Sequence, residues 1–375
     1  MSAQWAGRSA EQEQFAASLH DMLAAADVPG AARRWASGDH SDGRALWRKL
    51  AGTGVTALAV PEKWGGLGAS PLDTVVACEE LGHHALPGPV AESVAVVPGL
   101  IAALADGTAS PVLGDALPRL AAGDLIATLA LPPWLPYAPD ADVAGLVLLA
   151  ETGTTETDAE AGTAKDSVVA GLVLLAETGT TETHVLWLAE PGARHRSVDR
   201  ARSLSEVSRR EVLARGPAVA SATAQAFQTG ALASAAQLLG AGRALLTASV
   251  RHAGQRIQFG RPVGAFQAVK HHLADVAIGL EFARPLLDAA AVALAAGDRG
   301  AARDVSAAKV ACTEAASRAA RAALQVHGAI GYTEEHDLHL WLMKVRALAG
   351  TWGSQAEHRA RIMAELTAPD APPWN

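Results

Sequence analysis

The sequence predicts a mainly helical α+β protein in three parts. These are a helical N-terminal domain at residues 1–123, a small middle β-domain at 124–218 and a C-terminal four-helix bundle at 219–375. Apolar residues recur at helical spacing on both sides of the middle segment, whereas the middle segment consists of short apolar runs broken by Pro, Gly and Thr. Half of the 375 residues are hydrophobic and 19% are charged, which is typical of a packed globular chain with a sizeable core.

The N-terminal domain reads as a series of helices. A helix is expected over Glu11–Ala26, and the Pro and Gly of Val28–Gly30 are expected to stop it. A short amphipathic helix follows at Ser41–Gly52. Ser70 is a good N-cap for a helix over Pro71–Leu86, which has proline at its first position. Two further helices are expected at Val90–Ala105 and Leu113–Ala122.

Two adjacent glutamates, Glu79 and Glu80, lie on the helix expected over Pro71–Leu86. Neighbours on a helix point about 100° apart. We therefore expect one glutamate to be solvated and the other to be capped or paired, rather than two carboxylates that share acid–base work.

The middle β-domain contains an identical duplication, since Val143–Thr157 recurs as Val169–Thr183. A single duplicated segment is not a solenoid, which needs at least three repeats. Each copy offers one strand and a Thr-rich turn, so the two copies could compete for one place in the sheet. We predict that one copy is an integral strand and that the other lies at an edge or is loosely packed.

The segment 194–215 is rich in arginine and is expected to include the exit from the β-domain. We expect a solvated linker face there. The alternative is a surface that binds the phosphates of a large acyl carrier.

From Pro217 onward the pattern is helical almost to the end of the chain. Four long helices with short connections indicate an antiparallel bundle. The helices are expected at Ser221–Gln255, Gln267–Ala296, Arg303–Val326 and Glu334–Leu348, with a last one at Gln355–Leu366.

Composition excludes several classes of protein. A formal net charge of −8 argues against a nucleic-acid surface, which needs a strongly basic face. We expect no membrane span, because no apolar run reaches about 18 residues. We expect no signal peptide, because Met1–Arg8 is polar and no apolar core follows it. Cys78 and Cys312 are expected to be buried free thiols in a cytoplasmic protein. The histidines show no paired-ligand spacing, so no metal site is predicted.

The segment between the first two bundle helices carries the strongest chemical signal. Arg256, Phe259, Gly260, Pro262 and Gln267 surround a polar turn beside a helix N-terminus. An arginine and an amide beside a helix N-terminus can form an anion site. The alternative is an ordinary helix–helix turn in which the arginine is solvated.

A second segment, Gln325–Tyr332, follows one helical hairpin later. A helix ends there, and Gly328 and Gly331 turn the chain sharply, so backbone N–H groups could meet phosphate oxygens. A glycine-rich turn alone is weak support, because most such turns are helix caps. Its pairing with Arg256–Gln267 is more specific.

Together the two segments resemble the acyl-CoA dehydrogenase family. That family has an Arg-x-x-Phe-Gly-x-Pro-x-x-x-x-Gln segment and a Gln-x-x-Gly-Gly-x-Gly-Tyr segment at about this separation. The first is intact here, and in the second Ala329 replaces a glycine. The resemblance spans most of the chain, including 60–68, and is weakest at 124–218. It implies an acyl-CoA dehydrogenase fold, FAD as cofactor, and αβ-desaturation of an acyl-CoA by a carboxylate base and a hydride-accepting flavin.

The family dimer builds each flavin site from two subunits. One subunit supplies a Thr-Glu-Pro…Gly-Ser-Asp loop of the β-domain, and its partner holds the diphosphate and adenosine of FAD. The resemblance assigns this second role here to a set of residues from both segments: Arg256, Phe259, Gln267, Gln325, Val326, Gly328 and Ala329.

Both positions that carry the catalytic base in the family lack a carboxylate here. The family's Tyr-Glu-Gly-Thr segment corresponds to Thr351–Ser354, which places Trp352 at the base position, with Arg359 as expected downstream. Other members carry the base on the first bundle helix, near Gly230 in this chain. Indole has no proton acceptor at neutral pH, so we predict that this chain has no catalytic base.

The flavin-contacting loop of the β-domain also departs from the family. Where Thr-Glu-Pro is expected, the chain reads Ala130–Pro136, and no Gly-Ser-Asp follows. Pro132 and Pro133 lack the backbone N–H donors that a flavin or an acyl-CoA could use.

This combination resembles one subunit of the heteromeric acyl-CoA dehydrogenases with which actinobacteria degrade steroid side chains. The implied partner is a homologous chain that carries the catalytic base, and the complex would act on an acyl-CoA, with a steroid side-chain thioester as one option. Two alternatives stay open. One is an autonomous flavoenzyme with another base, such as Glu334 or Glu335, and the other is a non-enzymatic scaffold subunit.

Overall fold

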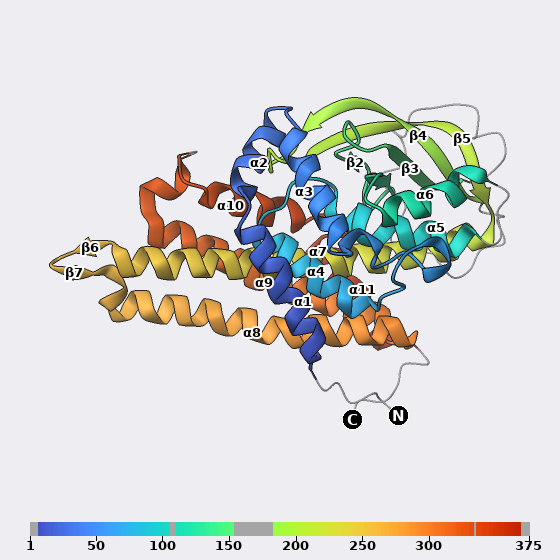
Figure 1. Ribbon diagram of the computed structural model, residues 1–375. Helices are drawn as coiled ribbons and strands as arrows, with labels where there is room; N and C mark the ends of the chain where they lie inside the picture. The colour runs from blue at the N-terminus through green and yellow to red at the C-terminus, as the bar shows by residue number, and fades with distance from the viewer. Residues whose placement is uncertain (1–6, 106–109, 154–182, 334, 369–375) are drawn as a thin grey trace.

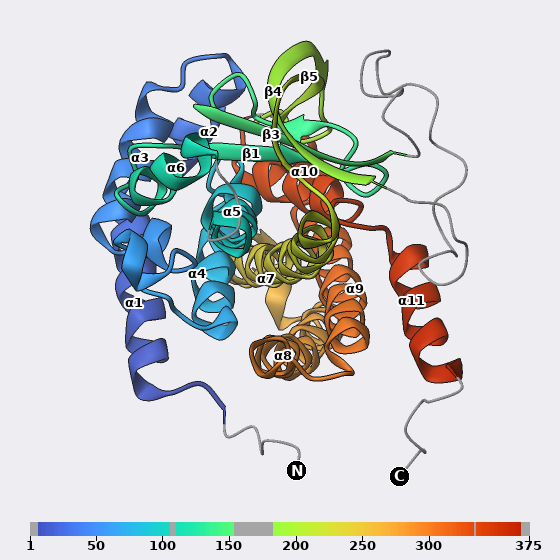
Figure 2. The ribbon, with the colours of Figure 1, turned by 90° about the vertical axis from the view of Figure 1, so that its right-hand side faces the viewer.

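The computed structural model describes residues 7–105, 110–153, 183–333 and 335–368 (Figure 1). Helices dominate, and a small five-stranded sheet covers part of one side of the long helices. Viewed along the long helices, the N-terminal helices lie on one side of them and the sheet lies above (Figure 2). This arrangement confirms the predicted mainly helical α+β class.

Capping side chains set the starts of two N-terminal helices. Ser9 and Gln12 form a capping box at one, and Ser70 and Asp73 form another, which confirms the predicted start at Pro71. The α-helices are α1 (Ala10–Ala24), α2 (Val28–Ala36), α3 (Ser41–Gly52), α4 (Pro71–His83), α5 (Val97–Ala105) and α6 (Pro111–Ala121). Two 3₁₀ turns, η1 (Val55–Ala57) and η2 (Glu62–Trp64), precede α4, and a π-helical turn, η3 (Glu92–Val96), leads into α5.

The segment that was expected to stop the first helix also starts the second one. The segment Val28–Gly30 opens α2 rather than only ending the helix before it. Asp27 is the N-cap of α2, and its carboxylate accepts a hydrogen bond from the Gly30 N–H at 2.9 Å. The backbone N–H groups in the first turn of a helix have no partner within the helix. Pro29 has no N–H, so it is compatible with a position in this first turn.

Glu79 and Glu80 are both buried, so the expectation that one is solvated was wrong. The Glu79 carboxylate lies 2.7 Å from Arg8, 2.6 Å from Arg243 and 3.1 Å from Arg284. Arg243 also lies 2.9 Å from Glu80. These cations come from the chain before α1 and from two bundle helices, so the spacing within α4 could not reveal them.

The sheet has the strand order β1-β3-β4-β5-β2. β1 pairs with β3 in parallel, and the other neighbours are antiparallel. The strands are β1 (Ala127–Ala130), β2 (Ala138–Pro139), β3 (Leu146–Gly153), β4 (Thr183–Arg196) and β5 (Ser203–Arg215).

The first copy of the duplicated segment provides β3, an integral strand between β1 and β4. This agrees with the prediction that one copy is integral. The second copy, 169–183, lies outside the described residues except for its last residue, at which β4 begins.

The arginine-rich segment is mostly strand, so the expectation of a linker was wrong, whereas the expected exposure to solvent holds for most of its arginines. It contains the end of β4 and all of β5. Arg209 lies 2.7 Å from the Glu151 carboxylate of β3, and the guanidinium groups of Arg209 and Arg215 lie 5.5 and 5.9 Å from the centre of the Trp187 ring. Arginine stems can cover apolar surface while their charged ends stay in water. An arginine-rich strand on the outer face of a sheet can therefore be mistaken for a solvated linker in the sequence.

The C-terminal half is built on α7, which packs against α4, α8, α9 and α10. At the contact with α4 the two backbones touch, because a Cβ on Gly240 would lie 1.8 Å from the Glu79 carbonyl oxygen. No described helix combines the length and hydrophobicity needed to cross a membrane. The helices are α7 (Pro217–Gln255), α8 (Gln267–Ala296), α9 (Ala301–His327), α10 (Leu338–Leu348) and α11 (Gln355–Thr367).

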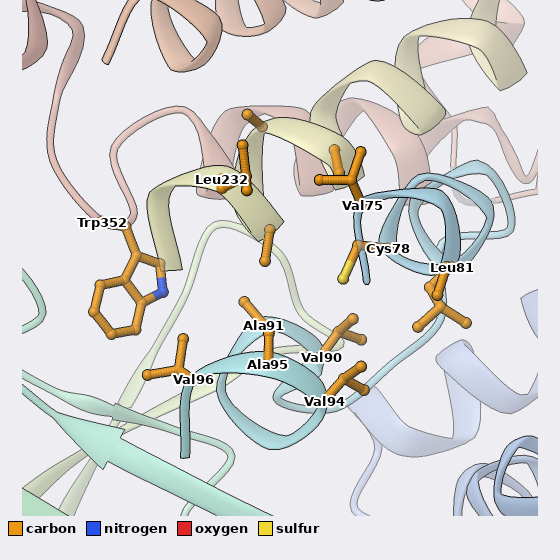
Figure 3. Close-up of a cluster of buried hydrophobic side chains, with 14 of the residues drawn as sticks. Val75, Cys78, Leu81, Val90, Ala91, Val94, Ala95, Val96, Leu232 and Trp352 are labelled. Carbon is orange, nitrogen blue, oxygen red and sulfur yellow. The ribbon is translucent and has the colours of Figure 1, made fainter. Parts of the chain in front are cut away.

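One continuous hydrophobic core joins the N-terminal helices, the inner face of the sheet and the bundle. Cys78 and Cys312 belong to this core as buried free thiols, as predicted. Figure 3 shows the part of the core at which α4, the helix over 90–105 and α7 meet, with Trp352 at its border beside Val96 and Leu232.

Candidate functional site

The segment between α7 and α8 forms a small hairpin that projects from one end of the bundle (Figure 1). Strands β6 (Ile257–Gln258) and β7 (Arg261–Pro262) pair antiparallel, and a 3₁₀ turn, η5 (Val263–Ala265), leads into α8. Phe259 and Gly260 form the loop with φ angles of 51° and 77°. Positive φ at both central residues is typical of a tight hairpin turn, but it is unfavourable for a bulky residue.

The Phe259 side chain is 91% exposed at the tip of this hairpin. An aromatic residue that is both strained and solvent-exposed gains little from the fold of its own chain. Strained residues of this kind cluster at binding sites. We therefore interpret Phe259 as a contact residue for something outside the described chain.

The end of α9 carries the second motif. α9 ends at His327, and Gly328 has a φ of 64° at the start of the 3₁₀ turn η6 (Gly328–Tyr332). Gln325 and Ala329 are exposed, whereas Val326 and Gly328 are half-buried.

Two stacked histidines hold the motifs together at the same end of the bundle. His252 of α7 stacks on His327 of α9, with ring centroids 4.3 Å apart. His252 lies one turn before Arg256, and His327 lies two residues after Gln325. The predicted cofactor residues of both motifs therefore lie around the ends of α7 and α9 and the start of α8.

This end of the bundle is electropositive. Arg251, Arg256, Arg261 and Lys270 are exposed there, and Arg256 forms no ion pair with a carboxylate of the described chain. α8 begins at Gln267, and no side chain caps its first N–H groups. A helix N-terminus beside exposed guanidinium groups attracts phosphate oxygens. The residues present are therefore compatible with a dinucleotide diphosphate.

The two predicted base positions, Gly230 and Trp352, lie in contact, and the indole ring fills the space between them. Trp352 is fully buried in the loop after α10, and a Cβ on Gly230 would lie 2.3 Å from its ring. Trp352 has a φ of 58°, and its carbonyl oxygen lies 2.9 Å from His358 Nε2. The indole occupies the volume into which a side chain at position 230 would project.

A buried carboxylate that the sequence reasoning missed lies beside Trp352. The indole N–H donates a hydrogen bond to Glu92 Oε1 at 3.0 Å, and Glu92 is 3% exposed. Glu92 lines a cavity of about 10 Å³ together with Arg202 and Lys344, which is roughly the room that one water needs. A lone acid in the apolar pattern 90–105 was the signal that could have found it.

The loop that replaces Thr-Glu-Pro packs onto the bundle through aromatic rings. Trp134 lies between Leu131 and Leu135, which are bridged to each other, and its ring centroid is 4.9 Å from that of Phe227 on α7. The Phe227 ring is covered by the Arg361 guanidinium at 4.4 Å. Side chains of this chain therefore occupy the space between the loop and α7. This place does not suit a flavin ring.

Comparison with known proteins agrees with the motifs and the fold. Residues 9–124 match the model of the acyl-CoA dehydrogenase N-terminal domain, and residues 219–367 match that of the C-terminal domain. The chain is 30% identical over 359 residues to the acyl-CoA dehydrogenase IpdE2 of Mycobacterium tuberculosis, with 95% of this chain and 97% of that protein covered. The chain therefore belongs to the acyl-CoA dehydrogenase family, whose members are FAD-dependent oxidoreductases acting on CH–CH groups.

Solved structures share the fold along nearly the whole chain. The ChsE4–ChsE5 complex of Mycobacterium tuberculosis has a TM-score of 0.76 at 23% identity, covering 97% of this chain and 99% of that one. A variant of the steroid ACAD Tcur3481–Tcur3483 has a TM-score of 0.74 at 22% identity, covering 94% of this chain and 96% of that one. At these identities the likeness shows the fold.

Proposed function

We propose that this chain is one subunit of a heteromeric FAD-dependent acyl-CoA dehydrogenase. In this proposal it supplies the half-site for the FAD diphosphate and adenosine and has no catalytic base. A homologous partner chain supplies the base and the surface for the flavin ring, and the complex desaturates an acyl-CoA between its α and β carbons.

One observation carries this proposal. The Trp352 indole is buried against Gly230, so a single ring occupies both of the predicted base positions. General acid–base catalysis contributes about 10²–10⁴-fold to a rate. A chain without a base at either position needs another source of that contribution. A second chain that retains the family's carboxylate is the simplest source.

The opposite end of the bundle supports the other half of the proposal. Arg256 is exposed and unpaired within the described chain, and the N-terminus of α8 lies beside it. FAD bound across this end would supply the hydride acceptor of the reaction. The role of Arg256 is to hold the diphosphate, and Phe259 and Gln325 present an aromatic ring and an amide to the rest of the nucleotide.

We propose a steroid side-chain CoA thioester as the substrate. The motivation is the Ala-, Arg- and Trp-rich sequence, together with the name of one protein of similar fold, the steroid ACAD Tcur3481–Tcur3483. The two chain names of that protein and of ChsE4–ChsE5 are in line with a heteromeric assembly.

Replacing Arg256 by Ala in the reconstituted complex is expected to lower its affinity for FAD at least about tenfold. The reason is the loss of a charge-assisted hydrogen bond, worth about 1.5–3 kcal/mol. The measurement is the FAD content of the purified complex, by absorbance after denaturation. Arg299→Ala is the matched control, because Arg299 is also exposed but lies in the connection between α8 and α9, away from the motifs.

The two outcomes separate the alternatives. FAD content that stays at the wild-type level in Arg256→Ala would remove the proposed half-site. A selective loss of FAD would exclude the scaffold alternative, in which the motif is a relic and the bundle only docks a partner.

A further inference from the structure

Three histidines meet between α1 and α4, far along the chain from the proposed flavin half-site. His20 comes from α1, and His83 and His84 come from the end of α4. One ring nitrogen from each lies within 4.8 Å of the other two, and all three side chains are half-buried. The ring centroids are 4.7–5.1 Å apart.

The spacing of one pair of these nitrogen atoms is close to that around a tetrahedral metal ion. His84 Nε2 lies 3.2 Å from His20 Nδ1, and His20 Nδ1 lies 3.0 Å from Glu80 Oε2. With metal–ligand bonds of about 2.0–2.1 Å, neighbouring ligand atoms of a tetrahedron are about 3.3 Å apart. Small rotations of these side chains would therefore make room for an ion between them.

The remaining contacts of Glu80 keep one of its oxygens directed at the histidines. Arg243 binds Glu80 Oε1 at 2.9 Å, whereas Oε2 lies on the side of His20. Glu80 does not belong to the group of ligand atoms that lie within 4.8 Å of one another, so its role is to hold His20 in place from outside that group, as surrounding residues do at protein metal sites.

Two of the histidines, His83 and His84, are also in the protonation state that a metal needs. Burial lowers the pKa of His83 and the pKa of His84 to about 4, so both rings are neutral near pH 7 and can offer lone pairs. His83 Nδ1 is buried and has no hydrogen-bond partner among the described residues. A buried polar atom without a partner needs an explanation, and a metal ion provides one.

We propose that His20, His83 and His84 bind a Zn²⁺ ion, with Glu80 holding the His20 ring in place. Imidazole nitrogens suit Zn²⁺, whereas Ca²⁺ and Mg²⁺ require oxygen ligands. The ion ties α1 to α4. The sequence did not reveal this site, because the ligands come from two helices and form none of the usual spacings.

The test uses the purified full-length chain, treated with a chelator and titrated with Co²⁺, which absorbs strongly in visible light when tetrahedral. We expect one tetrahedral Co²⁺ per chain, displaced by Zn²⁺, and a Zn²⁺-dependent rise in melting temperature. His20→Gln should lower the affinity by at least about 100-fold, since even residues outside the first ligand shell contribute about 10–100-fold. His195→Gln is the control, because His195 is a half-exposed histidine paired with Glu206 on the sheet.

The outcomes decide the proposal without relying on the variant alone. A wild-type chain that shows no tetrahedral Co²⁺ spectrum would overturn it. So would binding that His20→Gln and His195→Gln leave equally strong, because the ion would then lie elsewhere. His20 has 39% of its side chain exposed, so its replacement should leave the metal-free melting temperature near that of the wild type.

Discussion

Replacing Glu79 by Gln is expected to lower the free energy of unfolding by about 3–5 kcal/mol, the usual effect of removing one partner from a buried ion pair. The Glu79 side chain is fully buried among Arg8, Arg243 and Arg284, which come from three separate parts of the chain. Glutamine fills the same volume but has no charge. Among the described residues, the guanidinium groups would then share Glu80 and Asp288 as their buried anions.

The effect of Glu79→Gln should depend on pH with a defined sign. Burial by itself raises the pKa of Glu79, but the surrounding guanidinium groups of Arg8, Arg284 and Arg243 outweigh it, so the net pKa lies below the ordinary value of 4.5. The charged carboxylate therefore stabilises the fold above that ordinary value, and its contribution is lost as the pH falls through the folded-state pKa. The difference between wild type and variant should be largest near neutral pH and shrink in acid.

Urea denaturation of the two chains measures this difference. Glu314→Gln is the control, because Glu314 forms a half-exposed ion pair with Arg359 and such pairs contribute only about 0–1 kcal/mol. If Glu79→Gln were no more destabilising than Glu314→Gln, Glu79 would not be the centre that joins α4 to the bundle.

Replacing Trp352 by Ala is expected to cost about 3–5 kcal/mol, the usual range for truncating a large buried aromatic side chain. The indole is fully buried, and its N–H is the hydrogen-bond donor to the buried Glu92. Trp352→Phe keeps much of the packing but removes the donor and leaves Glu92 without this bond, so it should cost less, about 1–3 kcal/mol. Urea denaturation of both variants gives the two contributions.

A double-mutant cycle with Gly230 tests whether the two predicted base positions share one volume. In the wild type, Gly230→Ala places a methyl group 2.3 Å from the indole, and such overpacking costs about 1–3 kcal/mol. In the Trp352→Ala background the same methyl group enters vacated space, so its cost should vanish or reverse. Equal costs in both backgrounds would contradict the account of a single filled volume.

The sequence was most informative where chemistry is concentrated in short segments. Arg256–Gln267 and Gln325–Tyr332 were recognisable because their residue types and spacings are specific, and the absence of a carboxylate at Trp352 and Gly230 needs no structure to be seen. The helix starting at Pro71 was predictable because its capping box is local. The mainly helical class followed from the periodicity of the apolar residues.

Most of the features that sequence reasoning missed depend on contacts between distant segments, whereas the start of α2 after Asp27 is a local exception. The burial of Glu79 and Glu80 depends on three arginines from elsewhere in the chain. The packing of Trp134 on Phe227 joins the β-domain loop to the bundle, and the histidine cluster joins α1 to α4. The sequence reveals none of these contacts. Local periodicity shows which face of a helix or strand a residue lies on, but not which distant residue packs against that face.

Flavin stoichiometry tests the central claim most directly. The chain should be purified alone and after co-expression with a homologous acyl-CoA dehydrogenase chain that retains the family's base, and FAD should be counted per polypeptide. We predict a colourless chain on its own and a complex with half an FAD per polypeptide, which desaturates an acyl-CoA. A yellow chain that holds one FAD by itself and is reduced on adding an acyl-CoA would contradict the account, because it would show a complete flavin site and a working base within this single polypeptide.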